Sequence, residues 1–396
     1  MGKEILKSQK NFLYCKMNKT EVFFALLKAG IWEKDVRLSQ FEGIDFNEVY
    51  RLAEEQSVVG LVTAGLNHVI DTKIPKIDFL QFLGVTMHME DRNKAMNSFI
   101  ADLLEKLRKA GIYTLLVKGQ GIAQCYERPL WRSCGDVDLF LSEENYKRAK
   151  EFLIPIASKV DPEGVYSKHQ GMTIDSWVVE LHGRLTCGLA TGIDKQIDIV
   201  QDTVFYGGEV RSWQNGHIQV FLPSADNDVI FVFTHFLKHF YKGGLGLRQI
   251  CDWTRLLWTY HENINIDLLE KRLCAMGLTT EWKAFGAFAV EYLGMPIEAM
   301  PFLDGRWKME DGRSVLNARM KKKADRICDF ILEVGNMGHN RDSSYFEKYP
   351  YVIRKVFSLG RRISDLYRHA RLFPLDSIRF LPRIMFNGVM SAIRGE

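Results

Sequence analysis

Apolar residues recur every three or four positions along the first part of the chain. The pattern is clear in Glu21–Lys28 and Phe46–Val58, and it returns in Phe99–Leu107. This is the period of an amphipathic α-helix, so we expect the region 1–110 to be helical. Gly111 follows at a place where a helix commonly ends with a residue of positive φ.

Between residues 111 and 223 short apolar runs alternate with helical periods. A strand, a helix, a second strand, a second helix and then a hairpin are typical of a small mixed sheet with helices packed against it. Ser142 is suited to cap the second helix because its side chain can accept a hydrogen bond from the first turn. The predicted strands are Tyr113–Val117, Val137–Leu141, Gly171–Asp175, Trp177–His182 and Ile218–Leu222, and the predicted helices are Ile122–Tyr126 and Glu143–Phe152.

The helical period returns after residue 223 and continues through most of the remaining chain. Ser224 and Asp226 favour the start of a helix that we expect to run through His239. Gly335–Pro350 is polar and rich in turn-forming residues, which favours a loop or linker. The other predicted helices are Leu247–Tyr260, Ile266–Met276, Thr280–Leu293 and Ser314–Val334.

The chain therefore divides into four predicted segments. Residues 1–110 form an N-terminal helical region, 111–223 a core with a small mixed β-sheet, and 224–350 a C-terminal helical domain. Residues 351–396 form a basic amphipathic C-terminal segment. Because a small block of strands is flanked by blocks of helices, the predicted fold class is α+β.

Composition and charge exclude several classes of protein. The 396 residues carry a formal net charge of +4, which gives no global reason to expect nucleic-acid binding. The seven cysteines are scattered without a Cys-x-x-Cys pair, which argues against a disulfide framework and a zinc knuckle. No run of about 18 apolar residues occurs, and the N-terminus lacks the apolar stretch of a signal peptide. We therefore expect a reduced, cytoplasmic protein without a transmembrane segment.

The strongest chemical signal is GDVDLFL at residues 135–141. Side chains alternate between the faces of a strand, so Asp136 and Asp138 point the same way while Val137 and Leu139 point into the core. Two carboxylates about 6 to 7 Å apart on one face repel each other unless a cation lies between them. Mg²⁺ or Mn²⁺, which prefer oxygen ligands, would fill this place. The alternative is a solvated strand edge with two aspartates of no special function.

Two further motifs flank this strand in the sequence. Upstream, the predicted strand Tyr113–Val117 runs into Lys118, Gly119, Gln120 and Gly121, whose glycines and lysine suit a phosphate. A plain strand-to-helix turn is the alternative, because the loop is not a Walker A motif. Downstream, VVELH at residues 178–182 places Glu180 and His182 on one strand face. We expect Glu180 to join the two aspartates, and a surface position is the alternative.

The ordered set of these motifs resembles the polymerase-β-like nucleotidyltransferase superfamily. More closely, it resembles an uncharacterised bacterial nucleotidyltransferase family with a KG loop, an Asp-x-Asp strand and a later Glu-x-His strand. The resemblance extends over about residues 21–293, and it departs from the superfamily at Gln120, where a serine usually follows the loop glycine. The residues that carry it are Lys118, Gly119, Tyr126, Arg132, Asp136, Asp138, Glu180 and His182.

The resemblance implies a two-metal nucleotidyltransferase that uses Mg²⁺ or Mn²⁺. It makes Asp136, Asp138 and Glu180 the catalytic metal ligands, and an NTP the donor of a nucleoside monophosphate. The acceptor is a hydroxyl on a small molecule, a protein or an RNA. The residues implied in nucleotide binding are Lys118, Gly119, Gln120, Gly121 and Arg132. An inactive binding or regulatory protein with the same fold, and a metal-dependent phosphohydrolase, are the competing hypotheses.

Two polar pairs suit either a functional or a simpler role. Arg128 and Arg132 flank Pro129 and suit either a phosphate or a solvated loop. His235 and His239 have a spacing that can ligate zinc, but no glutamate follows His235, which argues against a zinc protease motif.

The helical spacing of Arg248 and Asp252 predicts an ion pair on one helix surface. The segment 351–396 interleaves arginines with large apolar residues. Such a segment can lie on an anionic membrane surface, which would make the protein peripheral to the inner face of the membrane, or it can bind nucleic acid or cover another subunit. A terminal helix docked on the rest of the chain is the simpler reading.

Overall fold

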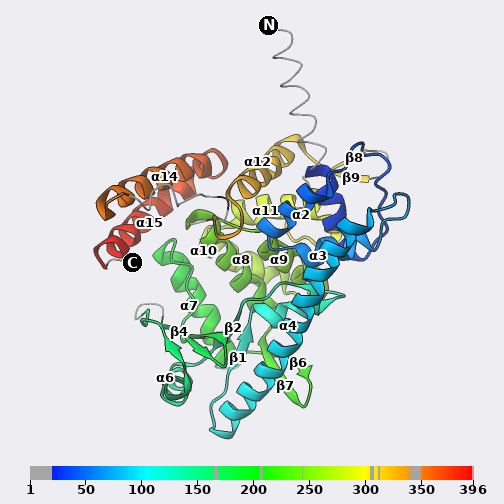
Figure 1. Cartoon of the computed structure of the whole chain (residues 1–396). Helices are drawn as coiled ribbons and strands as arrows, with labels where there is room; N and C mark the ends of the chain where they lie inside the picture. The colour runs from blue at the N-terminus through cyan, green and yellow to red at the C-terminus, as the bar shows by residue number, and fades with distance from the viewer. Residues whose placement is uncertain are drawn as a thin grey trace.

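The computed structural model describes residues 20–164, 168–205, 208–242, 244–303, 307–310, 313–338, 340 and 349–394. It confirms an α+β fold in which a small mixed sheet is flanked by helices (Figure 1). In these residues, short 3₁₀ helices connect larger elements: η1 (Pro129–Trp131), η2 (Ile154–Ile156), η3 (Ile297–Ala299) and η4 (Asn336–Gly338).

The central sheet has five strands in the order β1-β2-β5-β4-β3. Strand β2 pairs with β1 in the antiparallel sense and with β5 in the parallel sense, while β4 pairs antiparallel with both β5 and β3. The β4–β5 hairpin predicted from the sequence is confirmed. The strands are β1 (Leu115–Val117), β2 (Asp136–Phe140), β3 (Lys159–Val160), β4 (His169–Ile174) and β5 (Trp177–His182).

One face of this sheet is packed against helices, and the other carries the polar motifs. The buried residues Val137, Leu139, Val179 and Leu181 belong to one apolar cluster together with side chains of helices α4 and α6. The helices beside the sheet are α5 (Gly119–Ala123), α6 (Glu143–Leu153) and α7 (Thr191–Phe205). Helix α6 begins as predicted, because the Ser142 side chain accepts a hydrogen bond from the backbone of Asn145. Helix α7 was not predicted.

A separate two-stranded sheet, β6 (Val210–Asn215) and β7 (Ile218–Pro223), packs against β1 and α4. Only β7 was predicted, because β6 contains Arg211, Ser212, Gln214 and Asn215 and has no apolar run.

The N-terminal region is helical, as predicted for the residues that the structure describes. It consists of a helix over residues 20–32, then α2 (Phe46–Glu55), α3 (Val59–Leu66) and the long α4 (Lys76–Lys109). Helix α4 is followed by Gly111 with φ +70°, the conformation expected there. In Figure 1, α4 runs along one side of the molecule from the N-terminal helices toward the sheet.

The C-terminal half consists mainly of helices, of which α9 and α10 have the predicted bounds. The predicted helix Ser314–Val334 is wrong at its start, because residues 314–316 belong to a strand that precedes Asn317, the cap of α12. The predicted loop Gly335–Pro350 lies largely outside the described residues. The elements are α8 (Ala225–Lys242), α9 (Leu247–Tyr260), α10 (Ile266–Met276), α11 (Thr279–Leu293), β8 (Trp307–Glu310), β9 (Arg313–Leu316) and α12 (Ala318–Val334).

The main hydrophobic core lies among these C-terminal helices and extends to the N-terminal ones. Phe233 on α8, Trp253 on α9 and Trp282 on α11 are fully buried and contact one another edge to face or at a tilt. The same apolar cluster includes Phe23 and Val62 of the N-terminal helices. The two helical regions therefore share one core.

The C-terminal segment forms two helices, α14 (Tyr351–Leu372) and α15 (Pro374–Arg394), that pack against each other (Figure 1). Phe373 and Phe380 are buried and contact Tyr241 on α8, so the segment is docked on the rest of the chain. Within the described residues, no helix is both long enough and apolar enough to cross a membrane.

Candidate active site

The pairing of β2 with β5 brings three carboxylates together. The two strands run parallel with Asp138 directly opposite Glu180, and Asp136 precedes Asp138 by two residues on the same face. Carboxylate oxygens of all three residues lie within 4.8 Å of one another. The sequence placed Glu180 beside the aspartates only as an expectation, and the register of the parallel pair supplies the geometry.

Lys118 extends from the end of β1 into this cluster. Val117 pairs with Asp138 across the antiparallel ladder, and Lys118 Nζ donates a hydrogen bond to Asp138 Oδ1 at 2.7 Å. The backbone of Lys118 has φ +57°, which is uncommon for a residue other than glycine. Burial acts to lower the pKa of the Lys118 ammonium, but the charges of Asp138, Glu180 and Asp136 outweigh it and raise the pKa.

Two histidines contact the same carboxylates from β5 and β4. His182 Nε2 lies 2.7 Å from Asp138 Oδ1, and His169 Nε2 lies 3.0 Å from Glu180 Oε2. His169 was not singled out in the sequence. The predicted hairpin could have indicated it, because the antiparallel register of β4 and β5 places His169 opposite His182. His169, Glu180 and His182 form a second cluster whose ligand atoms lie within 4.8 Å of one another.

The three carboxylates differ in their electrostatic surroundings. Burial and the charge of Asp138 raise the pKa of Asp136. Burial would also raise the pKa of Asp138, but the charge of Lys118 and the hydrogen bond from His182 outweigh it and lower that pKa. Hydrogen bonds from His169 and His182 lower the pKa of Glu180. Three clustered carboxylates facing one ammonium fit a divalent cation with oxygen ligands such as Mg²⁺ or Mn²⁺.

A cavity of about 350 Å³ opens over the carboxylates. Its sheet side is lined by Lys118 and by the carboxylate cluster, and helices α8 and α9 line it with His235, Lys238 and Arg248. The cavity therefore carries carboxylates where the strands meet. Its helix side carries the cations Lys238 and Arg248, and the two aspartates there, Asp228 and Asp252, form ion pairs with Arg211 and Arg132.

The Lys-Gly-Gln-Gly stretch is not a loop as predicted, because helix α5 begins at Gly119, and it is packed more tightly than a phosphate-binding loop requires. Gln120 is 1% exposed and donates a hydrogen bond to Asn93 Oδ1. A Cβ at Gly121 would lie 2.8 Å from a methyl group of Leu222, and a Cβ at Gly119 would lie 3.2 Å from Cys134 Sγ. Gly119 lines the cavity, whereas Gln120 and Gly121 face the protein interior.

Arg132 lines the cavity but is paired with Asp252. Its Nε donates to Asp252 Oδ1 at 3.0 Å, and a second guanidinium nitrogen bonds to Oδ2. The predicted pair of Arg248 with Asp252 on one helix surface is therefore wrong. Arg248 instead donates to the backbone carbonyl of Ser133 at 2.9 Å. The tertiary packing brings Arg132, from the segment before β2, into contact with Asp252, whereas Arg248 on the same helix as Asp252 does not pair with it.

The remaining polar pairs take different positions. Arg128 forms an ion pair with Glu33 of the N-terminal region. The Nε2 atoms of His235 and His239 lie 3.1 Å apart and share a hydrogen bond, and both residues line the cavity. Among the described residues, the candidate metal clusters include neither of these two histidines.

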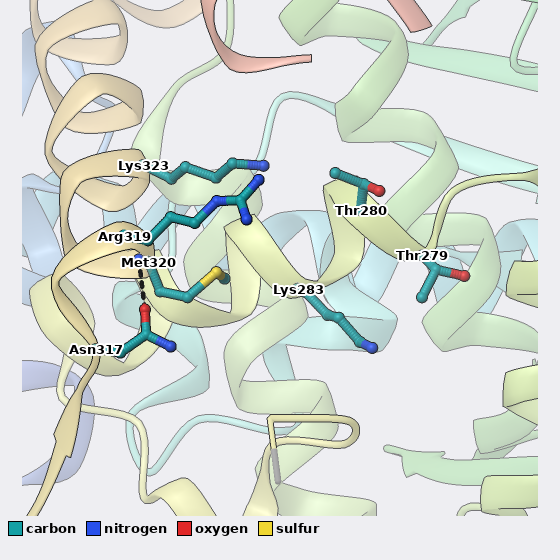
Figure 2. Close-up of a pocket in the computed structure, with 7 residues that line it drawn as sticks. All are labelled: Thr279, Thr280, Lys283, Asn317, Arg319, Met320 and Lys323. Carbon is teal, nitrogen blue, oxygen red and sulfur yellow. Dashed lines mark hydrogen bonds between the residues drawn. The ribbon is translucent and has the colours of Figure 1, made fainter. Parts of the chain in front are cut away.

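A second cavity of about 360 Å³ lies between α11 and α12 (Figure 2). It is lined by Thr279, Thr280, Lys283, Asn317, Arg319, Met320 and Lys323. This set contains no carboxylate or imidazole, so the cavity lacks the ligands that the first one offers to a metal ion.

Comparison with known proteins agrees with the geometry. A family model described as an uncharacterised nucleotidyltransferase matches residues 42–294, a span that includes the central sheet, the carboxylate cluster and helices α8 to α11. No curated protein and no solved structure matches the chain. The matched span is well over half of the 396 residues. The chain therefore belongs to the uncharacterised nucleotidyltransferase family.

Proposed function

We propose that this protein transfers a nucleoside monophosphate from an NTP to a hydroxyl acceptor in a metal-dependent reaction. Family membership supports nucleotidyl transfer in general. The observation that carries the finer proposal is the cluster of Asp136, Asp138 and Glu180 within 4.8 Å, at the floor of a cavity. Three carboxylates this close together repel one another, and bound cations relieve that repulsion.

In the proposed reaction the oxygen of the acceptor hydroxyl attacks the α-phosphorus of the NTP, and the hydroxyl proton passes to water. The bond from that phosphorus to the bridging oxygen of the β-phosphate breaks, and pyrophosphate leaves with the bonding electron pair. Divalent ions held by Asp136, Asp138 and Glu180 would neutralise charge on the entering and leaving oxygens. Lys118 and His182 hold Asp138 in place, and Lys118 adds a positive charge beside the reacting phosphate.

The test is incubation with each α-labelled NTP and Mg²⁺ or Mn²⁺. We expect Asp138→Asn to lower the rate of acceptor labelling by about 10²- to 10³-fold, because the substitution removes a ligand charge. The matched control is Asp175→Asn, an exposed aspartate at the turn of the β4–β5 hairpin, which should keep full activity. Equal activity of the Asp138 variant and the wild type would rule out this site.

The products separate the proposal from its alternatives. Labelled acceptor with released pyrophosphate supports nucleotidyl transfer, and running the reaction in cell extract shows whether the acceptor is a small molecule, a protein or an RNA. Free inorganic phosphate or free nucleotide as the only product would indicate a phosphohydrolase. No turnover with any NTP, together with partner binding that survives Asp138→Asn, would indicate a binding or regulatory protein.

A second proposal concerns helix α15, which we infer lies on an anionic membrane surface. Leu375, Ile378 and Phe386 are 80%, 69% and 63% exposed, on the side of the helix opposite the buried Phe380. Exposed apolar side chains suit a lipid surface, and the arginines of the adjoining helix α14 suit anionic head groups. Wild-type protein should co-sediment with phosphatidylserine vesicles, and Ile378→Asp should not. Binding to RNA that is unchanged by Ile378→Asp would favour nucleic acid instead.

A further inference from the structure

Helices α8 and α9 contribute the cations Lys238 and Arg248 to the cavity whose sheet side holds the carboxylate cluster. We propose that Lys238 of α8 and Arg248 of α9 hold the β- and γ-phosphates of the NTP, which become the pyrophosphate leaving group. This inference rests on the proposed function, because it assigns the nucleotide end of the same cavity. It assigns these phosphates to the helices and not to the segment Lys118–Gly121.

The cations that line the cavity differ in whether they have a carboxylate partner. Lys118 pairs with Asp138, Arg132 pairs with Asp252, and Arg184 pairs with Asp198. Among the described residues, Lys238 and Arg248 are the lining cations without a carboxylate within ion-pair distance. An incoming anion can therefore be neutralised by Lys238 and Arg248 without breaking an existing ion pair.

Lys238 is held as a partly buried cation beside other positive charge. Burial and the nearby ammonium of Lys118 lower its pKa. Both effects disfavour the charged form in the absence of a counter-ion, and an anion bound in the cavity would reverse them. Charge-assisted hydrogen bonds to phosphate oxygens are about twice as strong as neutral ones.

Arg248 has a hydrogen-bonding group that the protein leaves unused. One of its terminal nitrogens donates to the carbonyl of Ser133, but its buried Nε has no hydrogen-bond partner in the described part of the chain. Buried donors without a partner are rare, and a catalytic role or a bound ion is among the reasons for one. A guanidinium also suits phosphate because its donors form a planar fork.

The histidines of α8 complete this wall as neutral groups. Burial lowers the pKa of His235, and burial together with the charge of Lys238 lowers the pKa of His239 to about 4. Both imidazoles are then uncharged at neutral pH, and the hydrogen bond between their Nε2 atoms fixes their orientation. They shape the cavity beside Lys238 without adding charge.

The segment after β1 offers little room for the same phosphates. Gln120 and Gly121 face the interior, and α5 has only five residues, too short to offer a substantial helix dipole. Lys118 is already engaged with Asp138. With the α-phosphorus at the carboxylates, the outer phosphates therefore extend toward the two helices.

The experiment measures binding of Mg²⁺–tripolyphosphate by isothermal titration calorimetry, which needs no turnover. We expect Lys238→Met to weaken binding at least about tenfold, the effect of one lost charge-assisted hydrogen bond. Lys238→Arg should restore binding to within about threefold of the wild type. Lys242→Met is the matched control, because Lys242 lies one turn further along α8 and does not line the cavity. Lys238→Gln is a second neutral variant that replaces the Met variant if the latter does not fold.

Each outcome decides between the two claims. The site on α8 is supported if tripolyphosphate binding is weaker in the neutral Lys238 variants and unchanged in Lys238→Arg and in the Lys242 control. Binding that is equal in the Lys238 and Lys242 variants, or no tripolyphosphate binding by the wild type, overturns it. Lys238-dependent binding without labelled product from any NTP overturns the proposed function and leaves the α8 site standing. Transfer activity whose KM for NTP is unchanged by Lys238→Met overturns the α8 site and leaves the function standing.

Discussion

The side chain of Asp252 is held by two donors in a position almost without contact to solvent. Arg132 Nε and the Tyr126 hydroxyl both donate to Asp252 Oδ1, at 3.0 and 2.9 Å. The side chains of Arg132 and Asp252 are each 5% exposed. This pair connects α9 to the segment that leads into β2, and it therefore helps to position Asp136 and Asp138.

Removal of one partner of this ion pair should be costly. We expect Asp252→Ala to lower the free energy of unfolding by about 3–5 kcal/mol, because the guanidinium of Arg132 stays buried without its counter-ion. Denaturant unfolding followed by fluorescence measures the loss. The double variant Arg132→Met/Asp252→Leu should recover much of it, since both buried charges are then absent. A loss below about 1 kcal/mol in the single variant would contradict a buried, structural role for the pair.

At the scale of elements, the helix over residues 20–32 crosses α3 at two glycines. A Cβ at Gly65 would lie 1.9 Å from the carbonyl oxygen of Leu26, and a Cβ at Gly30 would lie 1.7 Å from that of Leu61. Near the start of α3, a Cβ at Gly60 would lie 2.0 Å from the carbonyl oxygen of Trp131. Glycine therefore lets α3 touch both its neighbouring helix and the loop before β2.

Alanine at the helix crossing should separate the two backbones. We expect Gly65→Ala to destabilise the protein by about 1–3 kcal/mol, the usual cost of an overpacked contact. The control is Gly84→Ala on α4, where a Cβ has open space within 4 Å. That change should stabilise the protein by up to about 1 kcal/mol through helix propensity. Melting temperatures compare the two, and shifts of the same sign would disprove the close crossing.

At the scale of the whole molecule, three helices from distant parts of the sequence meet at Glu281. The residue lies on α11 and is fully buried, and Tyr241 on α8 donates a hydrogen bond to it at 3.1 Å. Burial, and then the charge of Asp376 on α15, raise the pKa of Glu281 to about 8. The docking of α15 is thus coupled to the protonation of one buried carboxyl group.

This coupling predicts a dependence of stability on pH. An exposed glutamate loses its proton near its ordinary pKa of 4.5, whereas Glu281 in the folded chain keeps it until about pH 8. Between these two pH values the folded state therefore binds more protons than the unfolded state. The folded protein loses stability as the pH rises through that window, because Glu281 favours its protonated form only when it is buried. Glu281→Gln should raise the melting temperature more at pH 8 than at pH 5. Glu270→Gln, an exposed change on α10, is the control, and a gain equal at both pH values would refute the prediction.

The elements with strong local patterns were predictable from the sequence. Helices α9 and α10 and strand β5 have the predicted bounds, because their apolar residues follow one period between clear turn signals. Helix α7 and strand β6 were missed. Helix α7 has the helical period in Ile193, Ile197, Val200 and Val204, so its pattern was present in the sequence and overlooked. Strand β6 has no apolar run and takes its structure from pairing with β7.

The candidate site was only partly predictable for a related reason. Alternation along a strand places Asp136 with Asp138, and Glu180 with His182, on one face each. It cannot say that β2 and β5 are neighbours, nor that Asp138 lies opposite Glu180. His169, Lys238 and Arg248 were therefore not assigned to the site. Lys238 and Arg248 lie in predicted helices, whereas His169 lies two residues before the predicted strand Gly171–Asp175.

The sequence by itself determined which residues share a strand or helix face, because that depends on the backbone period alone. It also determined the family resemblance, through motifs that are continuous in the chain. The tertiary structure decided which faces meet. It set the parallel register of β2 with β5, paired Asp252 with Arg132 and not with Arg248, and brought α8 over the carboxylates. Such contacts join residues far apart in the chain. Their energies depend on how deeply the groups are buried, which follows from tertiary packing and not from a local sequence pattern.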